Sequence, residues 1–393
     1  MRVVYIIDSI VGGGAPKSLI EMVCELKRLY NVDPVVLTSQ NNGFNKTLDK
    51  YGIENYAVGH GSFMVGSPEK KWKKPFKWLI LYMEYHLKHR SSIEKSLKLI
   101  DWEKVDLIHS NSVRTDLGIE LARITKKRCI CHVREFAELD YNCWSYKASY
   151  IDYLNRGVDG FIAVSDSVKN YWISKGLTKE KIEVVYNGVD NRQIQRVDHS
   201  NWEEEKCLKL VIVGEVIKNK GQLQAALAIS LLPESIRKNI ILSVIGTVST
   251  KNERRLREVF LMAGIPENIR VLGMRNDVYE CLKNYHIGLM CSKAEAFGRV
   301  TAEYMHAGLA VIASNTGANP ELVKDNETGL IYDKNKTEDL SNKIERLFYD
   351  RRLMISIAQK GHDVAKKKYT CTINAERVYE CYRYVNKWSE RNI

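Results

Sequence analysis

The chain has 393 residues, 45% of them hydrophobic and 27% charged. This is an ordinary composition for a globular protein, at a length that predicts two hydrophobic cores. Its 60 Lys and Arg against 48 Asp and Glu give a formal charge of +12, which favours an anionic partner. The longest apolar stretch near the middle, residues 78–83, is far shorter than the roughly 20 residues that a membrane-spanning helix needs, which argues against a transmembrane protein.

The cysteines and the first residues indicate a reducing compartment. Nine cysteines, an odd number with no CxxC pair, support neither a disulfide framework nor a zinc site. The cluster of Cys129, Cys131 and His132 has the wrong spacing for zinc and lies in a predicted buried strand. The apolar run before the first glycines is too short for an export signal. We therefore expect a cytoplasmic protein without a metal or cofactor.

In the first half, apolar strands alternate with amphipathic helices, which is typical of a parallel sheet covered on both faces. Strands are expected at residues 3–7, 35–38, 107–109, 128–132, 160–164 and 182–186. A first helix follows the glycines, with Pro16 in its first turn and apolar residues at helical spacing: Leu19, Met22, Val23, Leu26 and Leu29. Periodicity lapses over residues 187–202, which we interpret as the linker.

The second half repeats this order. Its strands are expected at residues 208–213, 240–245, 269–272, 287–290 and 310–313, and its closing helices near residues 338–349, 353–369 and 373–388. The last helix carries four apolar side chains on one side: Val378, Tyr382, Val385 and Trp388. The prediction is two Rossmann-like, doubly wound α/β domains at residues 1–190 and 208–370, a linker at 191–207 and a helix at 371–393. Ligands are expected beyond the carboxyl ends of the strands, in a cleft between the two domains.

The segment SKAEAFGRVTAE, residues 292–303, combines features of an anion site. Gly298 lets a backbone approach a ligand, and the helix that follows presents the unpaired amides of residues 299–301. Glu303, one turn later, can accept hydrogen bonds from a ribose diol. Glutamates at this spacing alone would also fit a solvated helix face.

This segment resembles the E-x7-E motif of glycosyltransferase family 4, whose members are retaining enzymes of the GT-B fold. The resemblance implies that Glu295 contacts the donor sugar and Glu303 the nucleotide ribose. It extends along the chain: residues 12–15 resemble the family's glycine loop, residues 106–111, 132–135, 164–167 and 185–190 its strand ends, and residues 317–321 and 328–330 its closing loops.

The turn at residues 213–221 resembles the family's phosphate loop, and Lys220 matches the lysine that binds diphosphate. Glu215 stands where the family usually has arginine. A carboxylate there would repel a diphosphate unless it points away or a cation such as Lys218 or Arg299 compensates. This departure concerns the identity of the donor more than the reaction.

The resemblance implies a full set of site residues. His132, which by itself would fit a structural histidine, is expected at the donor sugar or the acceptor. The implied catalytic residues are Glu295, His132 and Lys220. The implied donor-binding residues are Gly13, Gly14, Asn187, Glu215, Lys220, Gly246, Arg275, Glu295, Ala296, Phe297, Gly298, Val300, Thr301 and Glu303, and the implied acceptor-binding residues are His109 and Arg134.

The expected reaction moves a sugar from a nucleotide diphosphate, with uridine as the expected base, to a glycan or lipid-linked acceptor in cell-surface polysaccharide synthesis. Lys220 and the helix amides would stabilise the leaving diphosphate. No carboxylate is an obvious nucleophile, so retention favours front-side attack, with Glu295 and His132 orienting the sugar.

The basic segment from Lys70 to Trp78 continues into Leu79, Ile80, Met83 and Leu87. This mixture of cations and apolar residues predicts contact with an anionic membrane on its inner face. A solvated loop and helix over the sheet fits equally well. Such a basic segment could also bind nucleic acid, but no nucleic-acid recognition motif accompanies it.

Three other functions fit parts of this sequence to different degrees. A nicotinamide dehydrogenase is disfavoured because Lys17 takes the third glycine position and no acidic residue follows the second strand. A GT-B sugar-nucleotide epimerase or phosphorylase would share the architecture. A non-catalytic, nucleotide-sugar-binding partner subunit remains open, with Glu215 as its one hint.

Overall fold

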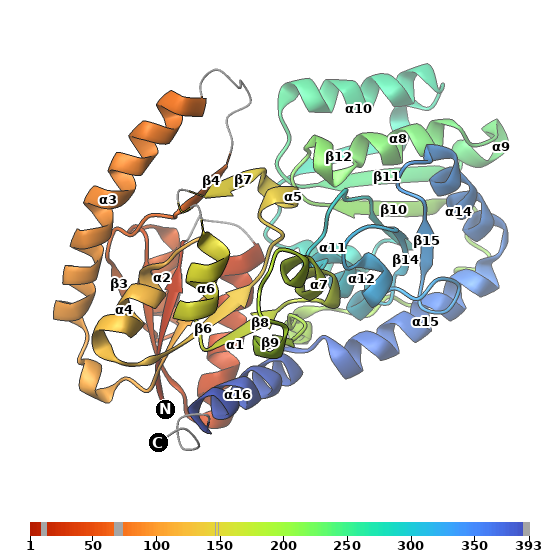
Figure 1. Cartoon of the computed structure of the whole chain (residues 1–393). Helices are drawn as coiled ribbons and strands as arrows, with labels where there is room; N and C mark the ends of the chain where they lie inside the picture. Colours follow the sequence, from red (N-terminus) through yellow and green to blue (C-terminus); the bar gives the residue numbers. More distant parts are fainter. Residues whose placement is uncertain (9–13, 67–73, 146, 148, 388–393) are drawn as a thin grey trace. The chain divides into compact units, whose positions relative to one another are not determined.

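The computed structural model describes residues 1–8, 14–66, 74–145, 147 and 149–387 (Figure 1). It divides into two compact units, each built on a parallel sheet flanked by helices. The N-terminal unit contains Met1–Gly188 together with Cys371–Ile393, and the C-terminal unit contains Val189–Thr370. The predicted α/β class with two Rossmann-like sheets is confirmed.

The N-terminal unit has a seven-stranded, fully parallel sheet in the order β3-β2-β1-β5-β6-β8-β9. The strands are β1 (Arg2–Ile7), β2 (Asp33–Thr38), β3 (Glu54–Ala57), β5 (Leu107–Ser110), β6 (Arg128–Val133), β8 (Gly160–Ala163) and β9 (Ile182–Val184). An antiparallel pair, β4 (Met64–Gly66) with β7 (Cys143–Ser145), lies outside this sheet. The sequence did not predict β3, β4 or β7, because these strands are short and lack an apolar run.

The helices of this unit are α1 (Gly14–Tyr30), α2 (Gly43–Lys50), α3 (Lys74–Leu99), α4 (Leu117–Thr125), α5 (Glu138–Tyr141), α6 (Tyr150–Gly157), α7 (Asp166–Ser174) and α16 (Cys371–Lys387). Helix α16 packs on α1, and Val378, Tyr382 and Val385 from its predicted apolar side enter the core around β1; Trp388 lies outside the described residues. The Tyr382 hydroxyl is 2.7 Å from His109 Nδ1 and donates to the Tyr5 hydroxyl at 3.2 Å. The last helix therefore belongs to the N-terminal unit.

The C-terminal unit has a six-stranded sheet in the order β12-β11-β10-β13-β14-β15. Its strands are β10 (Leu208–Val213), β11 (Ile240–Ile245), β12 (Ile269–Gly273), β13 (Ile287–Met290), β14 (Ala310–Ser314) and β15 (Leu330–Tyr332), of which β15 was not predicted. Its helices are α8 (Gln222–Ser230), α9 (Glu234–Arg237), α10 (Thr250–Met262), α11 (Val278–Leu282), α12 (Arg299–Ala307), α13 (Asn319–Leu322), α14 (Thr337–Tyr349) and α15 (Arg351–Lys368). The turns after β10 and β13 lie at the same edge of the sheet, because these two strands are parallel neighbours.

Candidate functional site

The turn after β10 is fixed against the end of β13. It contains a 3₁₀ turn, Lys218–Lys220, followed by Gly221 at φ +77°. A Cβ atom at Gly221 would lie 2.1 Å from the backbone oxygen of Cys291, so only glycine allows this approach. The Lys293 amide also donates to the Asn219 carbonyl at 2.7 Å. The predicted phosphate loop is therefore held at the carboxyl edge of β10 and β13.

Lys220 and Glu295, from these two turns, form an ion pair. Lys220 Nζ donates to Glu295 Oε2 at 3.0 Å, with the lysine side chain 38% exposed and the glutamate 16%. An ammonium group has three donor hydrogens, so Lys220 can keep this contact and still donate to an anion. Lys220 and Glu295 are 75 positions apart in the sequence and were each assigned through the resemblance to family 4; in the structure they lie together.

The predicted closing loop at residues 317–321 packs against the backbone of Glu295. The Ala318 amide donates to the Glu295 carbonyl at 2.8 Å. Gly317 has φ +56°, and a Cβ atom there would lie 2.3 Å from the Glu295 oxygen and 2.7 Å from its nitrogen. Gly317 thus permits the close packing that sets the position of Glu295.

Gly298, at φ +80°, precedes α12 and faces polar atoms. A Cβ atom there would lie 3.1 Å from Thr301 Oγ1 and 3.4 Å from Asn319 Oδ1. Both side chains are fully buried, and neither of these atoms has a hydrogen-bond partner among the described residues. Together with the first amides of α12, they give the space beside Gly298 donors and an acceptor suited to a phosphate and a hydroxyl group.

Glu303 is held by two partners. Its Oε1 atom accepts from Arg299 Nε at 3.0 Å and from the Tyr279 hydroxyl at 2.9 Å, and Arg299 Nη2 donates to that hydroxyl at 3.1 Å. Tyr279 comes from α11 and was missed at the sequence level, because nothing in its surroundings marks it as a partner of α12. The arrangement fixes the glutamate that the motif assigns to ribose binding.

Three other predicted donor residues, Glu215, Gly246 and Arg275, lie in the turns after β10, β11 and β12. Glu215 is exposed, and its backbone oxygen accepts from Gln222 Nε2 at 3.0 Å. A Cβ atom at Gly246 would lie 2.1 Å from the Gly214 oxygen, so the turns after β10 and β11 touch. Arg275 is exposed and makes a bidentate pair with Asp277, at 2.8 and 2.6 Å.

The remaining predicted donor-binding residues differ in burial. Phe297 is buried and packs edge-on against Tyr369, with ring centroids 5.8 Å apart. Ala296 and Val300 are partly exposed. Gly13 lies outside the described residues, and Gly14 is the exposed first residue of α1.

In the N-terminal unit, four predicted residues form one buried cluster. Arg134 donates to Asn111 Oδ1 at 2.8 Å, to Asn187 Oδ1 at 2.6 Å and to His132 Nδ1 at 3.2 Å. The rings of His132 and His109 lie 5.4 Å apart. Burial lowers the pKa of His109 to about 3, and burial with the Arg134 charge lowers that of His132, so both imidazoles are neutral at pH 7.

The contact with Arg134 fixes the tautomer of His132. A guanidinium group only donates, so His132 Nδ1 accepts and its proton resides on Nε2. That Nε2 donor is buried and has no hydrogen-bond partner within the described part of the chain. His132 therefore retains one directed donor at the end of β6.

Glu135, two residues beyond β6, was quoted within a motif but assigned no role. Ser112 Oγ donates to its Oε1 at 2.6 Å. Burial, helped by the Asp8 carboxylate, raises the pKa of Glu135 to about 7, although the Ser112 hydrogen bond and the Arg114 charge lower it. The turn that follows is strained, with Ala137 at φ +59°.

Glu135→Gln is expected to change how stability depends on pH. A carboxyl whose folded pKa is raised contributes stability below its unfolded pKa and loses it as the pH rises through the folded value. Between about pH 4.5 and 7, the native protein should lose about 3 kcal/mol relative to the variant, which keeps the Ser112 acceptor. Urea unfolding at pH 5 and pH 8 measures this difference; equal pH dependence in the two proteins would contradict it.

Cys129 and Cys131, which the sequence placed in a buried strand, lie in β6. Among the described residues, no group of three or more His, Cys, Asp or Glu is arranged to hold a metal ion. Cys129 and Cys131 are buried in β6, and burial raises the pKa of both thiols. They therefore behave as small core residues.

Two family models match consecutive parts of the chain, from residue 12 to residue 364. The model described as glycosyltransferase family 4 matches residues 12–193, and the model described as glycosyl transferases group 1 matches residues 194–364. Among curated proteins, the capsular polysaccharide biosynthesis glycosyltransferase CapM of Staphylococcus aureus is 28% identical over 239 residues. That match covers 58% of this chain and 62% of CapM, so it spans somewhat less than two thirds of the relative.

A second relative is the UDP-Gal:alpha-D-GlcNAc-diphosphoundecaprenol alpha-1,3-galactosyltransferase of Escherichia coli, 25% identical, covering 68% of this chain and 73% of that protein. Among solved structures, Anabaena HepE in complex with UDP superimposes with a TM-score of 0.77 at 18% identity, covering 97% and 99% of the two chains. A glycosyltransferase from Rickettsia africae gives 0.79 at 19% identity, covering 98% of each. At such identities the structural likeness establishes the fold.

Proposed function

Since the chain belongs to the GT-B glycosyltransferases of group 1 and family 4, we propose that it transfers a sugar from a nucleotide diphosphate to a glycan or lipid-linked acceptor with retention at the anomeric carbon. One structural observation supports this proposal in addition to the family assignment. Lys220, Glu295 and the start of α12 meet at one edge of the C-terminal sheet, beside unpartnered buried polar atoms of Thr301 and Asn319.

The chemistry follows from the charges that develop. Cleaving the bond between the anomeric carbon and the diphosphate leaves negative charge on the phosphate, which Lys220 and the amides of residues 299–301 would stabilise. In front-side attack, the leaving phosphate accepts the proton of the acceptor hydroxyl as the new glycosidic bond forms. Glu295 would orient the donor sugar, and the buried Nε2 donor of His132 would bind a sugar or acceptor oxygen.

The proposed donor and acceptor are inferred from the substrates named for related proteins. HepE was crystallised with UDP and with UDP-glucose, and the Escherichia coli relative is named for UDP-Gal and a diphosphoundecaprenol acceptor. These names favour a uridine-linked donor and a lipid-linked acceptor in cell-surface polysaccharide synthesis. A reaction without a metal or other cofactor is part of the proposal. A cytoplasmic protein touching the inner face of the membrane near Lys70 to Trp78 would reach such an acceptor; residues 67–73 lie outside the described residues.

A thermal-shift screen of nucleotide sugars tests the proposal. A ligand at about 100 times its Kd stabilises the native state by about 2.7 kcal/mol, so UDP-sugars should raise the melting temperature and GDP- or ADP-sugars should not. The stabilising donor is then incubated with and without candidate acceptors. Isomerisation or phosphorolysis without an acceptor would favour the epimerase or phosphorylase, and binding without transfer would favour the partner subunit. Failure of every nucleotide sugar to bind would refute the proposal.

A further inference from the structure

Helix α8 of the C-terminal unit is apolar on its exposed side as well as on its buried side. It packs against both α10 and α14 (Figure 1). Its buried side contains only apolar residues and one glutamine: Gln222, Ala225, Ala226, Ala228 and Ile229. Its exposed side carries Leu223 and Leu227 within the helix and Leu231 at the C-terminal cap, which are 41%, 42% and 54% exposed. We call these three side chains the leucine ridge. A helix that is apolar all round is normally buried, so the leucine ridge is the part of α8 that a single chain leaves uncovered.

The rows of side chains beside the leucine ridge form open grooves. Residues spaced four apart on a helix make the ridges along which helices pack on one another. One adjacent row contains Ala226 and Ser230, and the other contains Gln224 and Ala228. The Gln224 side chain is tied down, because its Nε2 donates to the Lys334 carbonyl at 2.9 Å. Small side chains therefore line most of the grooves, which leaves room for the side chains of another helix.

Shape and charge indicate that the other helix is α8 of a second copy of this chain. Interdigitation of such ridges from both helices is the commonest class of helix pair in globular proteins, and in a twofold interface each surface meets its own copy. The α8 sequence, QLQAALAIS, contains no charged residue, so two copies meet without repulsion. Helix α10 beside it carries charges of both signs in two ion pairs, Arg254–Glu258 at 3.3 Å and Arg257–Glu253 at 2.8 Å. An apolar centre with a polar rim is the usual anatomy of a protein interface.

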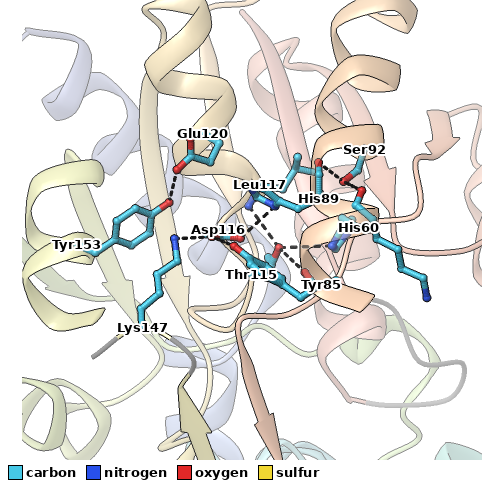
Figure 2. A network of polar contacts seen from close by, with 12 residues as sticks. His60, Tyr85, His89, Ser92, Thr115, Asp116, Leu117, Glu120, Lys147 and Tyr153 are labelled. Carbon is cyan, nitrogen blue, oxygen red and sulfur yellow. Dashed lines mark hydrogen bonds and ion pairs between the residues drawn. The ribbon is translucent and has the colours of Figure 1, made fainter. Parts of the chain in front are cut away.

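A second exposed apolar face, on α3, does not suit a copy of itself. Five of its apolar residues are 52% to 75% exposed: Phe76, Leu79, Ile80, Met83 and Leu87. They are turned outward because the buried Tyr85 of α3 and Lys147 both contact the buried Asp116 carboxylate (Figure 2). The α3 sequence contains six Lys and Arg against two Glu, so a twofold contact would bring like charges together. No helix in the part of the chain that the structure describes is long and apolar enough to span a membrane.

We propose that the chain forms a twofold dimer in which the leucine ridges of two copies pack into each other's grooves. Stable protein interfaces bury about 800 Å² on each partner, more than one helix of nine residues presents, so α10 must contribute as well. Leu261 and Met262 at the end of α10 are 63% and 80% exposed and are available for this contact. The proposal goes beyond sugar transfer and does not depend on it.

Sedimentation velocity of the full chain tests the dimer. Leu227→Arg places a charge at the centre of the leucine ridge, and the control Leu139→Arg places one on α5 of the N-terminal unit, where Leu139 is 58% exposed. Native protein should be mainly dimeric at about 20 μM, as expected for a dissociation constant of about 1 μM. Leu227→Arg should raise that constant at least about 30-fold, because the dimer would bury an unpaired charge, and Leu139→Arg should change it less than about twofold.

A cross-link checks the geometry without adding a charge. In a twofold crossing centred on the leucine ridge, the two copies of position 227 lie nearest the axis, and a disulfide can form when two Cα atoms are within about 7 Å. Mild oxidation should therefore give a covalent dimer of Leu227→Cys but not of Leu139→Cys. Native protein, which has nine cysteines, is the second control and should remain non-covalent. The cross-link decides the question on its own if Leu227→Arg fails to fold.

The variant Leu79→Ser/Met83→Ser measures the competing surface on α3 and should leave the dimer unchanged. Its melting temperature, like that of native protein, should rise with protein concentration, whereas that of Leu227→Arg should not, because association stabilises the native state by mass action. Native protein that stays monomeric at about 100 μM would overturn the proposal. So would a dimer that survives Leu227→Arg, or one that is lost in the α3 variant.

Discussion

Lys220→Ala is expected to weaken UDP binding by about 10- to 100-fold, because it removes a charge-assisted hydrogen bond worth about 1.5–3 kcal/mol. The same change should lower the transfer rate by about 100-fold or more, since the lysine stabilises charge that grows as the diphosphate leaves. Glu295, only 16% exposed, would also lose its cation and repel the incoming diphosphate. Calorimetry with UDP measures the first effect, and UDP release in the presence of donor and acceptor measures the second.

Lys238→Ala is the matched control for this prediction. Lys238, which directly follows α9 in the same unit, also pairs with a glutamate, Glu234 Oε1, at 2.5 Å, but both side chains are more than half exposed. Removing it changes the net charge by the same amount without touching the turns after β10 and β13. If the two variants bind UDP equally, Lys220 has no direct part in holding the diphosphate.

Gly317→Ala is expected to destabilise the C-terminal unit by about 2–5 kcal/mol and to abolish most donor binding. About 1–2 kcal/mol comes from placing a side chain in the left-handed region, and about 1–3 kcal/mol from the overlap with the Glu295 backbone. Since the added Cβ would lie 2.3 Å from the Glu295 oxygen, the loop that carries Glu295 must move. Urea unfolding measures the stability, and the donor-induced shift in melting temperature measures binding.

Gly264→Ala separates these two contributions. Gly264 follows α10 in the same unit at φ +74°, and nothing lies within 4 Å of its added Cβ. The control should therefore lose only the backbone contribution of about 1–2 kcal/mol and keep full donor binding. Equal losses of binding in the two variants would show that the contact between Gly317 and Glu295 does not position the site.

Much of the candidate site could be predicted from local sequence. Gly298 before a helix has a chemical meaning within a few residues, and the repeated strand–turn–helix order brings the turns to one edge. The roles of Lys220, Glu295 and Glu303 came from the resemblance to family 4. The Lys220–Glu295 pair is the result. Tyr279 and Glu135 were not assigned because their roles depend on neighbours distant in sequence.

What the sequence by itself determined is the class of fold, the order of the strong strands and the chemistry of the motif around Gly298, because all three depend on periodicity or on contacts within a turn. The direction that α3 faces was decided by the tertiary structure alone. Its apolar residues predict a helix, but the helix turns them outward because Tyr85 and His89 meet Asp116 and Lys147. Leaving a buried carboxylate without its partners costs more free energy than leaving five apolar side chains exposed.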